Sequence, residues 1–289
     1  MPNRRLIPVI FMLACSLIPL HANILAHSIK KGVGMGPKGP GMGPGKHPRE
    51  WQRRLKELHV HWFYDWRSRR PSATPKGLTF VPMIWGDHPI VIWNYHPNLP
   101  ASIKRIIHYH HSGLVQDMLG FNEPDNRTQS VVSVSSALKA WPELESAGTP
   151  LGSPACVLPD SPWMKAFMRG VQRHHYRVNF MCIHWYGGPY PKAFIGMLRH
   201  IHNLFHRPLW ITEFGVGDWK ANKTHPNIYS PQVVARYMRT VLPVLNRLPY
   251  VQRYAWFPSR KSKFTGLGTS ALFNKNGTLT RLGRIYAAD

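Results

Sequence analysis

Acidic residues are scarce in this sequence. Thirteen Asp and Glu stand against 37 Lys and Arg in a chain of 289 residues, which gives a formal net charge of +24. A field of that sign attracts anions such as nucleic acid, anionic lipid or acidic glycan. The sequence contains no recognition-helix pattern, zinc-finger spacing or aromatic–glycine motif, so no specific nucleic-acid partner is expected. The scarcity also leaves few candidates for any chemistry that needs paired carboxylates.

Cysteine is equally rare. Apart from Cys15 near the N-terminus, only Cys156 and Cys182 are present. A disulfide between these two and a pair of buried thiols both remain open. A histidine cluster has no nearby cysteine and no second matching cluster, so it predicts a solvated helix or loop and not a zinc site; its members are His108, His110 and His111. No metal and no organic cofactor is expected.

No apolar run reaches the length of a membrane-spanning helix. The run at 6–20 follows two arginines and is shorter than the about 20 residues that a span needs. This pattern predicts a signal peptide over residues 1–26, cleaved after Ala22 or Ala26. A lipoprotein signal that leaves Cys15 lipidated is the alternative. The protein is therefore expected to be secreted, extracellular or periplasmic, or lipid-anchored through Cys15.

The stretch after the signal is rich in Gly, Pro and Lys. Such a composition cannot bury a core, so residues 27–58 are predicted to form a flexible basic linker. A positively charged tether can associate with an anionic cell surface. The folded domain, expected to be a monomer, is predicted over residues 59–289.

Within that domain, short apolar runs alternate with longer amphipathic stretches. The runs are too short for helices and do not alternate strictly, as is typical of parallel strands buried on both faces; they cover 61–64, 78–84, 118–121, 180–183, 209–211 and 254–257. Helices are predicted after the cap residues Ser130, Ser161 and Ser230, and over 191–205.

This alternation over the whole domain favours an α/β fold with a single (β/α)8 (TIM-type) barrel. A doubly wound open sheet is the main rival, but no glycine-rich phosphate loop follows an early strand. The third strand cannot be placed between residues 87 and 116.

Two glutamates follow predicted strands directly. Glu123 ends the run LGFNE, and Glu213 ends LWITE. The carboxyl ends of barrel strands form one rim, so both side chains are expected at the same cleft. Two facing carboxylates are what the hydrolysis of a glycosidic bond requires: one protonates the leaving oxygen, and the other attacks the anomeric carbon or activates water.

Polar and aromatic residues near these glutamates suit sugar binding. Asn122 can bond a sugar 2-hydroxyl, and Tyr186 can orient Glu213. The series His184, Trp185, Tyr186 follows another strand, and Trp256 ends the last one, where it can stack on a sugar face. Two carboxylates near strand ends are secondary candidates for sugar contact or for a structural role: Asp65 and Asp87.

The motifs, taken in order, resemble glycoside hydrolase family 128. They are FVPMIWG (80–86), LGFNEPD (119–125), LGSPA (151–155), HWY (184–186), WITEFG (210–215), RYAWF (253–257) and LFNKNGTLTRLGRIY (272–286). The resemblance implies a retaining β-1,3-glucanase acting on a β-glucan polysaccharide or oligosaccharide. It makes Glu123 the acid/base and Glu213 the nucleophile. It also places Trp85, Asn122 and His184, with Tyr186 and Trp256, in the sugar site.

In such a mechanism Glu123 needs a raised pKa, which repulsion from Glu213 would supply. Because the family also contains oligosaccharide-binding members, a non-catalytic β-glucan-binding protein on the same barrel is the alternative. A cationic adhesin or nucleic-acid binder is a third possibility, and a steep dependence of binding on salt would identify it.

Overall fold

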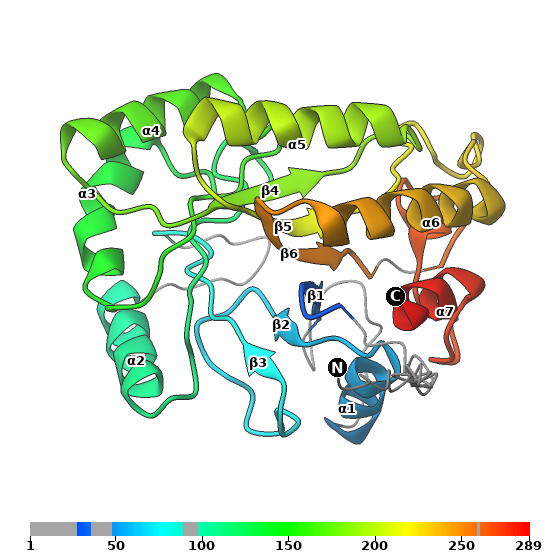
Figure 1. Cartoon of the computed structure of the whole chain (residues 1–289), viewed down its shortest axis with the longest axis horizontal. Helices are drawn as coiled ribbons and strands as arrows, with labels where there is room; N and C mark the ends of the chain where they lie inside the picture. Colours follow the sequence, from blue (N-terminus) through cyan, green and yellow to red (C-terminus); the bar gives the residue numbers. More distant parts are fainter. Residues whose placement is uncertain (1–27, 36–47, 89–97, 259–260) are drawn as a thin grey trace, which may run out of the picture.

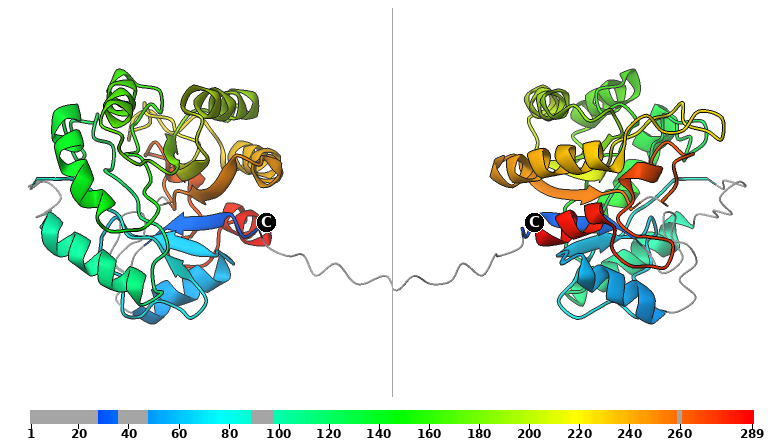
Figure 2. Two further views of the ribbon diagram at one scale, coloured as in Figure 1. Left: turned by 60° about the vertical axis from the view of Figure 1, so that its left-hand side comes forward. Right: turned by 90° about the vertical axis from the view of Figure 1, so that its right-hand side faces the viewer.

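The structure is a computed structural model that describes residues 28–35, 48–88, 98–258 and 261–289. The predicted signal peptide and Cys15 lie outside these residues. Within them, no helix is both long and apolar enough to cross a membrane. Figures 1 and 2 show strands enclosed by an outer layer of helices.

The six named strands form one parallel sheet in the order β3-β2-β1-β6-β5-β4. Their bounds are β1 Lys31–Gly34, β2 Trp62–Tyr64, β3 Thr79–Phe80, β4 Met181–Trp185, β5 Leu209–Phe214 and β6 Val251–Trp256. Parallel bridges continue this sheet beyond β3 and back to β4; they pair Met83 with Leu119, Met118 with Leu151, Asn122 with Ala155, and Gly152 with Phe180. The segments at 118–122 and 151–155 thus supply two further strand positions, and the sheet closes as the predicted (β/α)8-type barrel.

Helices alternate with these strands on the outside of the barrel (Figure 2). They are α1 Pro48–Glu57, α2 Leu99–His111, α3 Val134–Glu145, α4 Pro162–Arg173, α5 Pro191–Phe205, α6 Pro231–Arg247 and α7 Arg281–Ala288, with a 3₁₀ turn η2 at Gly268–Ser270. Ser161 and Ser230 cap α4 and α6 as predicted, each accepting a backbone N–H of the first turn. The cap of α3 is Ser133 and not Ser130.

The prediction of a linker over 27–58 is wrong for the described part of that stretch. β1 lies in the middle of the sheet between β2 and β6, and α1 packs on the core through the buried Trp51. The glycines that suggested a linker have a packing role. A Cβ on Gly32 would lie 2.1 Å from the Trp62 ring, and one on Gly34 would lie 2.8 Å from Tyr64. Glycine here lets large rings of β2 lie against the backbone of β1.

The structure also shows why no third strand could be placed from the sequence. Among the described residues between 87 and 116, the chain forms α2 and no strand. The missing strand positions are β1 and the segment at 151–155.

Two apolar clusters divide the interior. The larger lies between sheet and helices, and the smaller fills the barrel with Trp62, Tyr64, Val81, Met83, Trp85, Leu119, Ala155, Phe180, Cys182, Trp210 and Ala255. Cys156 and Cys182 are both buried free thiols, so the disulfide left open by the sequence is absent. The packed barrel leaves its chemistry to the rim at the carboxyl ends of the strands.

Candidate active site

Glu123 lies at the rim, directly after the segment at 118–122. Its backbone N–H donates to the Ala155 carbonyl at 2.7 Å, which holds it against the next strand segment. Its φ of 42° is left-handed, a conformation that costs energy for a residue with a side chain and that is found mostly at functional sites. The residue is 9% exposed, and its carboxylate oxygen Oε2 accepts a hydrogen bond from Asn126 Nδ2 at 2.8 Å.

Glu213 belongs to β5 and is 6% exposed. Its Oε1 accepts a hydrogen bond from Trp66 Nε1 at 2.8 Å and lies 3.1 Å from the Tyr64 hydroxyl. The Tyr186 hydroxyl donates to Oε2. Burial, with the negative charge of Glu213 next in effect, raises the pKa of both phenols. They therefore stay neutral donors that fix and stabilise a charged carboxylate.

His184, on β4, joins the two glutamates. Nδ1 lies 2.9 Å from Glu123 Oε1, and Nε2 lies 3.6 Å from Glu213 Oε1. A register irregularity between Ile183 and His184 sets this position, opposite Glu213 on β5. The three side chains have the composition of a metal site. The two ring nitrogens face different carboxylates, so the imidazole lies as a bridge between Glu123 and Glu213.

The pKa of Glu123 differs from the expectation drawn from the sequence. Burial acts to raise it. The hydrogen bond and positive charge of His184, with the hydrogen bond from Asn126, outweigh burial and hold the pKa of Glu123 below its usual value. For His184, burial acts to lower the pKa, but the charges of Glu213 and Glu123 raise it above its usual value. The predicted raised pKa of Glu123 is therefore wrong for the free protein, because the hydrogen bond and the charge of His184 together with the Asn126 bond outweigh burial.

Aromatic side chains surround Glu213. Tyr186 packs edge-on against Trp219 and Phe257, with ring centroids 5.8 and 5.7 Å apart, and Phe257 also contacts Trp66. Trp219 is 68% exposed, and its indole N–H donates to the Tyr186 carbonyl at 3.1 Å. These rings offer flat apolar faces beside a carboxylate pair, an arrangement suited to a sugar chain.

Comparison with known proteins agrees with this geometry. The family described as "Glycosyl hydrolase catalytic core" matches residues 44–286. A subgroup I endo-β-1,3-glucanase of glycoside hydrolase family 128 from Amycolatopsis mediterranei, solved as a glutamate-to-alanine mutant with laminaripentaose, is 30% identical. The match covers 90% of this chain and 99% of that one, with a TM-score of 0.71. The chain belongs to glycoside hydrolase family 128.

Other family 128 proteins share the fold at lower identity. A subgroup II endo-β-1,3-glucanase from Pseudomonas viridiflava is 24% identical over 91% of this chain and 98% of that one, with a TM-score of 0.67. A subgroup VII oligosaccharide-binding protein from Trichoderma gamsii is 21% identical over 89% and 92%, with a TM-score of 0.65. The comparison with curated proteins gives no match.

Two tryptophans predicted to contact sugar are placed elsewhere in this glycoside hydrolase. Trp256 is fully buried on the outer side of the sheet, where its ring packs on Phe214 and its N–H donates to the Ser270 carbonyl. Trp185 stacks on Phe194 of α5, also in the helix layer. Neighbouring residues along a strand point to opposite faces, so Phe257 and not Trp256 reaches the site.

Trp66, Tyr64, Trp219 and Phe257 were not predicted as site residues. Trp66 has a φ of 61°, so it is left-handed like Glu123. Its two chain neighbours, Asp65 and Arg67, are bonded to each other. The buried Asp65 carboxylate accepts hydrogen bonds from the Arg67 backbone N–H at 3.3 Å and from the Arg67 guanidinium. Asp65 thus positions the indole that binds Glu213. Its place after a strand was the only sequence signal for this role.

Asn122 and Trp85 lie beside Glu123, and the Trp85 carbonyl accepts the Asn122 backbone N–H at 3.0 Å. Asn122 is buried, and its Nδ2 donates to Gln129 Oε1 at 3.2 Å. Within the described ranges, Asn122 Oδ1 and His184 Nε2 are buried without a hydrogen-bond partner. Trp85 belongs to the cluster inside the barrel, which borders Trp66. Asp87 contacts its neighbour His88.

Proposed function

We propose that this glycoside hydrolase cleaves β-1,3-glucan with retention of configuration, with Glu213 as nucleophile and Glu123 as acid/base. The observation that carries the proposal is the spacing of the carboxylates. One oxygen of each glutamate and a ring nitrogen of His184 all lie within 4.8 Å of one another. Retaining enzymes hold their carboxyl groups about 5–5.5 Å apart, whereas inverting enzymes leave about 6.5–9.5 Å for a water molecule.

The surroundings of the two glutamates support different roles. Glu213 accepts bonds from neutral aromatic donors, which favour a charged carboxylate ready to attack an anomeric carbon. Glu123 instead faces His184, a group that can give and take a proton. The Glu123–His184 pair holds one proton, and its transfer from Nδ1 to Oε1 makes Glu123 a carboxylic acid.

Two displacements then complete the reaction. Glu213 bonds to the anomeric carbon while the glycosidic C–O bond breaks and the leaving oxygen takes the proton of Glu123. Glu123, now a carboxylate, removes a proton from water. The water oxygen then displaces Glu213 from the sugar, and both glutamates regain their starting charge.

The substrate class is proposed from the site and the relatives together. Aromatic rings and amides surround the carboxylates, which suits a neutral glucan better than an acidic one. Asn122 Oδ1, which is buried without a partner among the described residues, is the proposed acceptor for a sugar hydroxyl. The Amycolatopsis relative, with laminaripentaose bound, supports a β-1,3 linkage.

The decisive experiment compares laminarin-type, mixed-linkage and β-1,4 glucans as substrates. We expect hydrolysis of laminarin, with the β-anomer formed first in proton NMR. If the α-anomer forms first, the enzyme inverts the configuration and the proposed double displacement is wrong. Binding of laminarin without any products would favour the oligosaccharide-binding alternative, and preference for a uronic-acid polymer would overturn the substrate class.

We also propose that the protein is exported as a monomer, either released or anchored through a lipid on Cys15. Its positive surface is then proposed to associate with an anionic cell surface. The support is the N-terminal sequence and the net charge of +24. Mass spectrometry of the cell fractions should find a mature chain that lacks about the first 22–26 residues, or a lipidated one. Cytoplasmic protein with Met1 intact as the main species would rule out export.

A further inference from the structure

The charge of this protein is distributed unevenly over its helices. α4, α5, α6 and α7 carry Lys and Arg side chains but no Asp or Glu. The buried carboxylates gather instead near the rim, where Asp65, Glu123, Glu213 and Asp218 lie. The outer wall made by these helices therefore attracts anions, while the catalytic rim does not share that bias.

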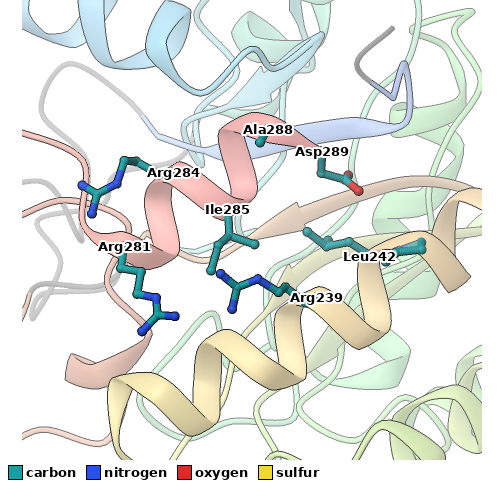
Figure 3. A pocket seen from close by; sticks show the side chains of 8 residues that line it. Arg239, Leu242, Arg281, Arg284, Ile285, Ala288 and Asp289 are labelled. Atoms are coloured by element: carbon teal, nitrogen blue, oxygen red, sulfur yellow. The ribbon is translucent and has the colours of Figure 1, made fainter. Parts of the chain in front are cut away.

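A groove between α6 and α7 concentrates this charge (Figure 3). It has a volume of about 430 Å³, and its lining combines arginines with apolar side chains: Arg239, Leu242, Pro243, Arg281, Arg284, Ile285, Ala288 and Asp289. Figure 3 shows the Arg239 and Arg281 side chains extending from the two facing helices over the space between them. Leu242 and Ile285 provide an apolar surface beside the two guanidinium groups.

These two arginines have no counterion in the described part of the chain. The guanidinium groups of Arg239 and Arg281 make no hydrogen bond or ion pair with another described residue, whereas that of Arg284 donates to the Leu279 carbonyl at 3.0 Å. The one carboxylate in the lining, Asp289, is already bonded to Asn246 and Tyr254. Arg239 and Arg281 are therefore free to bind an external anion.

We propose that this groove binds a phosphate group of a phosphodiester polymer. Planar guanidinium groups bind the oxygens of a phosphate in pairs, and two of them facing one space suit a tetrahedral anion better than a single carboxylate. Asp289, further along the groove, can accept a hydroxyl of the unit that carries the phosphate. The apolar side chains then contact its carbon atoms.

A polymer fits this surface better than a lipid bilayer does. Within the helices α4, α5, α6 and α7 themselves, Leu204 is the one exposed large apolar side chain, at 40%, so these helices offer little to insert between lipids. The helices α4 and α5, which also lack Asp and Glu, add a diffuse positive charge to the same wall, which attracts a chain of phosphates without a specific contact. Because the groove lies on the outer wall, a bound polymer leaves the catalytic rim open to glucan.

The test compares two double variants of the full chain. Arg239→Gln/Arg281→Gln removes the groove charges, and Lys192→Gln/Arg199→Gln removes two exposed charges of the same sign from α5. Binding to poly(glycerol phosphate) is measured by titration at several salt concentrations, with inorganic phosphate as competitor. Anionic phosphatidylglycerol vesicles and neutral laminarin serve as the other ligands.

We expect the groove variant to bind poly(glycerol phosphate) at least about tenfold more weakly and the control variant less than about threefold, since paired guanidinium–phosphate bonds exceed diffuse attraction. Laminarin hydrolysis should be the same in all three proteins. Equal losses in the two variants would overturn the site in favour of diffuse charge. Tighter, groove-dependent binding to vesicles than to the polymer would overturn the choice of occupant.

Discussion

His184 Nδ1 lies 2.9 Å from Glu123 Oε1, and the other nitrogen of the same ring lies 3.6 Å from Glu213 Oε1. One imidazole therefore contacts both carboxylates of the site. Its charge lowers the pKa of Glu123, while the two glutamates raise its own pKa. In the proposed mechanism, the acid/base is therefore a Glu123–His184 pair that shares a proton and not a lone carboxylic acid.

The pH profile should reveal this pair. In the unchanged protein, the proton remains on the pair until the pH passes the raised pKa of His184. Without the imidazole, Glu123 must hold the proton alone and loses it at lower pH, as a carboxylic acid does. We therefore predict that His184→Gln moves the alkaline limb of kcat/KM on laminarin to lower pH.

Asn126→Ala is the matched control, because it removes the other hydrogen bond to Glu123 and leaves the imidazole. Its activity should fall, but its alkaline limb should not move to lower pH, because loss of this bond acts to raise the pKa of Glu123. A His184→Gln profile that is lower but unshifted would mean that the histidine only positions its neighbours.

The two glutamates should respond differently to azide. Glu213→Ala should lose activity on natural glucan by on the order of 10²-fold or more, because no covalent intermediate forms. Azide should restore cleavage of an activated aryl glycoside with inverted configuration. Glu123→Ala should keep the first step with a good leaving group, and azide should then give a product of retained configuration. Opposite stereochemistry in the two rescues would reverse the assigned roles.

Substitutions of the two adjacent aromatic residues at the end of β6 should affect different properties, one the stability of the protein and the other its activity. Trp256 is fully buried against Phe214, so Trp256→Ala should lower the free energy of unfolding by about 3–5 kcal/mol. Phe257 contacts Tyr186 at the site, and Phe257→Ala should instead lower kcat/KM by about tenfold with little change in stability. Urea unfolding and laminarin kinetics measure the two effects. A stability loss as large for Phe257→Ala as for Trp256→Ala would contradict the placement.

Asp65 should make stability depend on pH. Burial raises its pKa from 3.8 to about 6, although the charge of Arg67 opposes this. Between these values the folded protein holds a proton that the unfolded chain has released, so the contribution of Asp65 to stability falls as the pH rises. Asp65→Asn should remove this loss. Relative to the unchanged protein, it should gain on the order of 2 kcal/mol between pH 4 and pH 7 in urea unfolding.

Arg67→Gln provides the opposite case, since removal of the guanidinium raises the pKa of Asp65 further and should steepen the loss. Parallel stability profiles for all three proteins would show that Asp65 titrates alike in the folded and unfolded chains.

The sequence by itself predicted the barrel, the starts of α4, α5 and α6, and the position of Glu123 and Glu213 at the ends of strands, because these depend on local patterns. A strand that ends in Glu and a Ser–Pro pair that opens a helix carry their meaning in a few neighbouring residues. β1 was missed because its glycines resemble a linker until the rings of Trp62 and Tyr64 are placed against them.

Only the tertiary structure decided which aromatic residues lie beside Glu213 and which side chain shifts the pKa of Glu123. Trp256 and Phe257 differ by one position, and the register of β6 against β5, which no local pattern encodes, sends one to the core and the other to the site. The pKa of Glu123 depends on an imidazole 61 residues away in sequence, and electrostatic interactions act through distance in space and not along the chain.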